Sequence, residues 1–103
     1  DGGEDGGEVG VDDRTELMEI AWETLETARV IYERHSEGES ANAKLNRIEL
    51  SRVLNRIGEH EMEDEKFDDA ITDLEKSLEL RKALLPPGHN DRADTYNLLG
   101  MAL

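Results

Sequence analysis

The feature that most constrains the fold of this chain is a pair of short apolar motifs that alternate along it. The segment from Leu54 to Gly58 (L-x-x-I-G) recurs from Tyr96 to Gly100 (Y-x-x-L-G), 42 residues later. The segment from Ala21 to Ala28 (A-x3-L-x2-A) recurs from Ala70 to Ser77 (A-x3-L-x2-S), 49 residues later. Spacings of three and four residues place the apolar side chains of each motif on one face of a helix. The alternation therefore predicts a repeating array of helices.

Turn signals divide this array into four helices. The first break is the polar stretch 36–40, whose Ser40 is the expected N-cap of the second helix. The second lies in an acidic stretch near residues 63–66, and the third is Pro86-Pro87-Gly88, where proline cannot donate a backbone hydrogen bond. Asp91 is the expected cap of the last helix. No stretch alternates with period two, so the predicted fold is all-α, with helices at about 14–35, 41–62, 67–85 and 92–103.

The motifs also predict how neighbouring helices pack. Gly58 and Gly100 have no side chain, so a second helix can approach them closely, and Ala21 and Ala70 play the same part on the other helix of each pair. Larger apolar residues fill the space between. The expected repeat core comprises Ala21, Trp22, Leu25, Ala28, Leu54, Ile57, Gly58, Ala70, Leu74, Tyr96, Leu99 and Gly100.

The alternating motifs resemble the tetratricopeptide repeat (TPR), whose signature is a W-x2-L-G-x2-Y half followed by an A-x3-F half. The segment 66–71 (K-F-D-D-A-I) is similar to the turn and second-helix start of that family. Leu54, Glu61 and Leu74 depart from the signature, and the 42-residue distance exceeds the usual 34. The resemblance implies helical hairpins stacked into a right-handed α-solenoid. The order of the halves, with a second half first, implies an array truncated at both ends and cut from a longer protein.

The resemblance also implies a binding surface, because the first helices of successive TPR pairs line the concave face of the solenoid. The expected channel-lining residues come from the second and fourth helices: Asn55, Glu59, Glu63, Asp94, Asn97 and Met101. This surface is mixed in charge and mildly acidic. It suits an extended peptide or a helix.

Charge narrows the class of partner. The 103 residues hold 26 acidic and 12 basic side chains, a net charge of -14, which disfavours direct binding to nucleic acid or anionic membranes and favours a basic protein. Residues 1–16 alone hold seven acids, five glycines and one base. Because glycine resists regular structure and dense like charge opposes collapse, we predict a disordered acidic segment at 1–13, followed by the helical array at 14–103. The segment is either a solvating linker or an arm for a basic protein.

No motif for catalysis or for a cofactor is present. The chain has no cysteine, which excludes disulfides, cysteine-based zinc sites and thiol nucleophiles. His35, His60 and His89 are dispersed without metal-ligand spacing. Acid pairs occur throughout the acidic helices, so none can be singled out for general acid–base catalysis. We therefore predict a binding protein that is not an enzyme and needs neither metal nor cofactor.

Trp22 and a strip of basic residues each allow two interpretations. Trp22 is either a packing residue between helices or a partly exposed anchor for a ligand. The strip on the second helix either pairs with nearby acids such as Glu49, or clamps a carboxylate-ended peptide as in some TPR co-chaperones. The strip comprises Lys44, Arg47, Arg52 and Arg56.

One segment resembles a narrower family. The acidic tract leads directly into residues 20–34 (IAWETLETARVIYER), which are similar to the second helix of the interrupted repeat in the nuclear autoantigenic sperm protein family of histone chaperones. In that family a long acidic insertion splits one repeat. The resemblance implies binding of the arginine-rich core histones of the nucleosomal tetramer, in the nucleus, with the cytoplasm as a second location. It places six acids in the histone-binding insertion: Asp1, Glu4, Asp5, Glu8, Asp12 and Asp13.

Two other TPR functions stay open. The 42-residue spacing and the loop at 84–93 resemble cargo adaptors of the kinesin light chain kind, and a chaperone-binding co-chaperone is the third alternative. An acidic glycine-rich tract before Trp22 favours the histone chaperone over the adaptor. Because two of the four helices lack the other half of their pair, we also expect a poorly stable monomer that forms a homodimer or a helix-exchanged oligomer.

Overall fold

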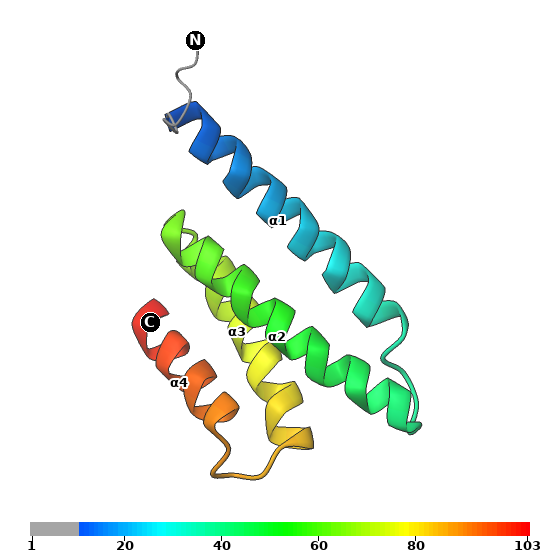
Figure 1. The fold of residues 1–103 in the computed structure, drawn as a ribbon. Helices are drawn as coiled ribbons and strands as arrows, with labels where there is room; N and C mark the ends of the chain where they lie inside the picture. Colours follow the sequence, from blue (N-terminus) through cyan, green and yellow to red (C-terminus); the bar gives the residue numbers. More distant parts are fainter. Residues whose placement is uncertain (1–10) are drawn as a thin grey trace.

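A computed structural model describes residues 11–103, with side chains from Glu19 onward. Over this range the chain forms four helices and no strand, which confirms the predicted all-α fold of helical hairpins. The helices are α1 (Val11–Arg34), α2 (Ala41–Glu63), α3 (Phe67–Leu84) and α4 (Asn90–Ala102). Figure 1 shows successive helices running in opposite directions, and α2 packs against each of the other three.

The helix boundaries differ most from expectation at the first helix. Helix α1 begins at Val11, so residues 11–13 are helical and their assignment to the disordered segment is wrong. No glycine lies between Gly10 and Gly38, and acidic residues at a helix start interact favourably with the positive end of the helix dipole. The remainder of that predicted segment, residues 1–10, lies outside the described residues. The other three helices begin and end within two residues of the predicted positions.

Side chains cap two of the helices. The Ser40 hydroxyl accepts a hydrogen bond from the Ala43 amide at 3.1 Å, which confirms Ser40 as the N-cap of α2. The cap of α4 is His89, whose Nδ1 accepts from the Asp91 amide at 3.0 Å. The prediction that Asp91 caps this helix is therefore wrong. Asp91 is the second residue of α4, where its negative charge interacts favourably with the positive end of the helix dipole.

The loop between α1 and α2 is held by side chains from the first turns of α2. Arg47 Nη1 donates to Ser36 O at 2.7 Å and to Gly38 O at 2.8 Å, and Asn46 Nδ2 donates to His35 O at 2.8 Å. These bonds satisfy carbonyls of the loop itself, which belong to neither helix. Arg47 is thus a structural residue of this loop and does not belong to an open basic strip.

The apolar core lies between α2, α3 and α4. Leu54, Ile57, Ala70 and Leu74 are at most 1% exposed. A Cβ atom on Gly58 would lie 2.7 Å from Leu74 Cγ, which confirms the close helix approach predicted there. Leu99 is also buried.

Three groups of predicted core residues are less buried than expected. Tyr96 is 48% exposed, and a Cβ on Gly100 would meet open space, so this face of α4 is largely open. In the described part of the chain no helix follows α4 to cover this face. The four α1 positions are half-buried, because α1 packs along α2 through one face: Ala21, Trp22, Leu25 and Ala28.

Candidate functional site

A groove runs between α2 and α4, and it brings the six predicted channel-lining residues together. It consists of two hollows of about 400 and 490 Å³ that share Arg56, Glu59 and Leu98. We call it the α2–α4 groove. Its other lining residues are Arg52, Asn55, Arg81, Asp94 and Asn97 in the first hollow and His60, Met62, Glu63 and Met101 in the second. The binding role of these residues stays a prediction.

Charge and polarity change along the α2–α4 groove. The first hollow contains three arginines, of which Arg52 forms an ion pair with Glu49 at 3.2 Å. The second hollow contains Glu59 and Glu63 beside apolar and thioether side chains. One end can therefore hold a carboxylate or carbonyl oxygen, and the other can hold a basic side chain against a soft apolar surface.

Asn55 forms part of the groove floor but is buried, contrary to its predicted exposure. Its Oδ1 lies 2.7 Å from Ser77 Oγ on α3 and 3.2 Å from Thr95 Oγ1 on α4. Asn55 is 9% exposed, and Ser77 and Thr95 are fully buried. The amide therefore joins three helices, because a buried polar group must find its partners within the protein.

Arg81 extends the same buried network. Its Nε donates to Ser51 Oγ at 3.0 Å, and its Nη1 donates to Asp91 O at 2.7 Å and to Thr95 Oγ1 at 2.9 Å. Burial lowers the pKa of Arg81, and the negative charges of Asp91 and Asp94 partly oppose that shift. Motif spacing did not single out this arginine. Its position seven residues after Leu74, on the buried face of α3, could have marked it.

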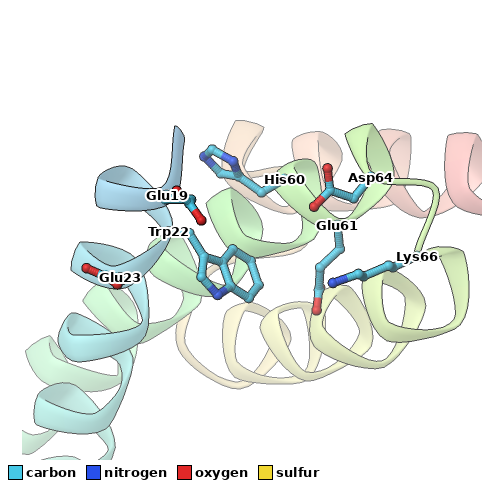
Figure 2. Close-up of a pocket in the computed structure, with 7 residues that line it drawn as sticks. All are labelled: Glu19, Trp22, Glu23, His60, Glu61, Asp64 and Lys66. Carbon is cyan, nitrogen blue, oxygen red and sulfur yellow. The ribbon is translucent and has the colours of Figure 1, made fainter. Parts of the chain in front are cut away.

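A separate cavity of about 400 Å³ lies between α1 and the carboxyl end of α2; we call it the Trp22 pocket. Figure 2 shows the side chains that line it: Glu19, Trp22, Glu23, His60, Glu61, Asp64 and Lys66. The half-buried indole of Trp22 meets the His60 ring edge-on, with centroids 6.3 Å apart and an interplanar angle of 68°. Trp22 thus packs between helices and also faces a cavity, so the structure keeps both of its interpretations open.

Glu61 forms the most buried wall of the Trp22 pocket. It stands where the TPR signature has tyrosine, is 7% exposed, and has a buried Oε1 without a hydrogen-bond partner among the described residues. Burial, together with the Asp73 side chain and the charges of Asp69 and Glu26, raises the pKa of Glu61 to about 8. From the sequence alone, Glu61 is only a departure from the TPR signature.

The acidic segment is described only in part. Asp1, Glu4, Asp5 and Glu8 lie outside the described residues, and the backbone of Asp12 and Asp13 lies in the first turn of α1. Within the described residues, no three side chains of the metal-binding types lie close enough to hold an ion. None of the four described helices has the length and apolar character needed to cross a bilayer.

Comparison with known proteins gives matches over most of the chain. The SHNi-TPR family model matches residues 51–88, which include most of α2 and all of α3. Protein NASP homolog 1 of Caenorhabditis elegans is 39% identical over 94 residues, which cover 84% of this chain and 24% of that protein. Protein HGV2 of Halocynthia roretzi is 35% identical over 85 residues, which cover 82% of this chain and 16% of that protein. No solved structure matches the chain.

Proposed function

This chain belongs to the nuclear autoantigenic sperm protein (NASP) family, and on that basis we propose that it binds arginine-rich core histones as part of a histone chaperone. Because the chain spans 24% and 16% of the two relatives, the activity of the whole protein is part of the proposal. We assign it a nuclear location, with the cytoplasm as a second one. TPR arrays act by binding, so the proposal includes no catalytic step.

The observation that carries the proposal is the α2–α4 groove, whose second hollow combines Glu59 and Glu63 with Met62 and Met101. A histone segment lying in this groove would place an arginine beside the two carboxylates, where charge-assisted hydrogen bonds form. Its apolar side chains would contact the methionines, which adapt to irregular surfaces. The groove thus offers a shape-specific hold on one segment.

The acidic segment supplies the second part of the proposed mechanism. Its six carboxylates, at Asp1, Glu4, Asp5, Glu8, Asp12 and Asp13, would neutralise histone arginine and lysine side chains and so compete with DNA phosphate. Attraction between exposed charges is screened by salt. Replacing all six by the corresponding amides should therefore weaken histone binding at low salt and make it less dependent on salt. An unchanged salt dependence would show that the acidic segment takes no part in histone binding.

A charge-reversal pair tests the groove directly. Glu59→Arg with Glu63→Arg should weaken binding of the nucleosomal tetramer histones by about tenfold or more, because like charges then face the histone arginines. The matched control is Glu75→Arg with Glu79→Arg, two exposed glutamates of α3 that are also four residues apart and lie outside the groove. Fluorescence anisotropy with labelled histones measures both. Equal losses of histone affinity in the two variants would show that the net charge of the chain determines binding and that the groove does not.

The co-chaperone alternative, a clamp for a carboxylate-ended peptide, would require the three arginines of the first hollow. Two of them are already engaged, because Arg52 pairs with Glu49 and Arg81 donates into the core. Arg56 remains to bind a carboxylate. A peptide with a free C-terminal carboxylate should therefore bind no better than its amidated form.

A further inference from the structure

The Trp22 pocket is negatively charged and large enough for a side chain. Four acids line it, Glu19 and Glu23 from α1 and Glu61 and Asp64 from the end of α2, against a single lysine, Lys66. The cavity of about 400 Å³ exceeds the volume of any one side chain, so a residue and part of its backbone can enter. Low-dielectric walls strengthen the attraction of such a cluster for a cation.

A second observation, independent of the charge of the pocket, is a buried oxygen atom that lacks a hydrogen-bond donor. Glu61 is more than nine-tenths buried and lines the pocket, yet its Oε1 has no hydrogen-bond partner among the described residues. In Figure 2 the Trp22 indole and the Glu61 side chain enter the same space from α1 and α2, and in this view the Lys66 side chain ends near the Glu61 carboxyl. A buried acceptor without a donor is costly, and an N–H group entering from a ligand would remove that cost.

The charged groups that act on Glu61 come from two other helices and are acidic. Glu26 on α1 and Asp69 and Asp73 on α3 all add negative potential. Arg29 on α1 is already engaged by Glu26 and Glu33. Because the pKa of Glu61 is raised to about 8, Glu61 stays protonated near neutral pH, and the negative charge of the pocket comes from Glu19, Glu23 and Asp64, against the single lysine Lys66.

We propose that the Trp22 pocket binds one arginine side chain of a basic partner protein, with the guanidinium over the Trp22 indole and its N–H groups directed at the pocket carboxylates. Arginine fits better than lysine because its planar group stacks on aromatic rings and presents several donors in a fixed fork. The proposal builds on the histone-binding function, since histones supply such side chains. It adds a site on the α1 side of α2, whereas the α2–α4 groove lies between α2 and α4.

The pocket contains its own reporter, because Trp22 is the only tryptophan in the chain. The probe is a blocked pentapeptide with one arginine between glycines, titrated into the full 103-residue chain while Trp22 fluorescence is recorded. We expect a saturable change in intensity or wavelength. The same peptide with citrulline, a neutral group of the same shape, should bind about fivefold more weakly or not at all. Equal responses to the two peptides, or no saturable response, would overturn the proposal.

Variants locate the response within the pocket. Glu19→Gln with Glu23→Gln removes two exposed carboxylates of the pocket rim. This pair should weaken binding of the arginine peptide about fivefold. Glu75→Gln with Glu79→Gln removes the same charge from α3 and should leave binding of the arginine peptide unchanged. If both pairs weaken binding equally, general surface charge explains the effect and the pocket proposal is wrong. These rim variants keep the test available even if a change at buried Glu61 prevents folding.

The test separates this proposal from the proposed function. Tetramer histones that bind the chain normally while the arginine peptide leaves Trp22 unchanged would overturn the pocket and leave the function standing. A saturable peptide response in a chain that binds no histones would support the pocket and overturn the function.

Discussion

Leu74 packs directly on the backbone of Gly58 where α3 crosses α2. A Cβ atom on Gly58 would lie 2.7 Å from Leu74 Cγ and 2.8 Å from Leu74 Cδ2, distances that Cβ atoms do not adopt in proteins. Gly100 occupies the same motif position in α4, where a Cβ would meet no atom within 4 Å. One sequence motif thus places glycine in two opposite environments.

This contrast predicts that alanine substitutions at the two glycines change the stability of the chain in opposite directions. Gly58→Ala should destabilise the chain by roughly 1–3 kcal/mol, because Leu74 must shift within a packed core. Gly100→Ala should stabilise it by about 0.5–1 kcal/mol, because alanine favours an exposed helix. Urea unfolding followed by circular dichroism measures both. A Gly58→Ala chain as stable as the parent would contradict the close approach of the two helices.

Arg81 should be the most sensitive polar residue of the fold. Arg81→Met removes donors to Ser51, Asp91 and Thr95 and should cost roughly 2–4 kcal/mol of unfolding free energy. Arg81→Lys should recover little of this, because an ammonium cannot reproduce the planar fork. The control is Lys82→Met, an exposed neighbour expected to change stability by less than about 0.5 kcal/mol. Similar losses for Arg81→Met and Lys82→Met in urea unfolding would contradict the network.

Glu61 should make stability fall as pH rises. Its pKa is about 8 in the folded chain against 4.5 for an ordinary glutamate, so the folded state holds the proton more tightly between these values. The stabilisation is complete below pH 4.5 and is lost as pH rises through 8. Glu61→Gln cannot ionise, so it should match the parent near pH 4.5 and exceed its stability by roughly 1–3 kcal/mol at pH 9. Urea unfolding at both pH values measures the difference, and a constant difference would contradict the pKa shift.

Exposed apolar residues on α1 predict self-association. Ile20 is 58% exposed and Ile31 is 47% exposed, and both line a shallow apolar hollow with Ala28. A second copy of the chain could cover this face. Sedimentation should show a dimer that becomes monomeric with Ile20→Glu and Ile31→Glu. Leu45→Glu, at an equally exposed site on α2, should leave the dimer intact. A parent chain that sediments as a monomer at high concentration would contradict the predicted self-association.

Local periodicity predicted the helices and much of the core, because spacing on a helix determines which residues share a face. It placed Leu54, Ile57 and Leu74 in the core correctly. It failed for Tyr96 and Gly100, because burial depends on whether a second helix covers the face, which no local motif encodes. The polar network of Asn55 and Arg81 was missed for a related reason. Its partners lie 10 to 40 residues away in the chain, so only the packed fold brings them together.

The bonds that hold α1 are unevenly distributed along its length. Among the residues whose side chains are described, its polar ties to other helices lie at Glu33, through Lys76, and in the loop at residues 35–38, through Asn46 and Arg47. Trp22 lies about 18 Å along the helix from Arg34. Over the rest of its length α1 packs on α2 through a half-buried apolar face, so its described polar ties to other helices lie at the carboxyl end. A rotation of about 5° there would move Trp22 by about 1.5 Å. The width of the Trp22 pocket would therefore respond to a small change of angle at the loop that Arg47 holds.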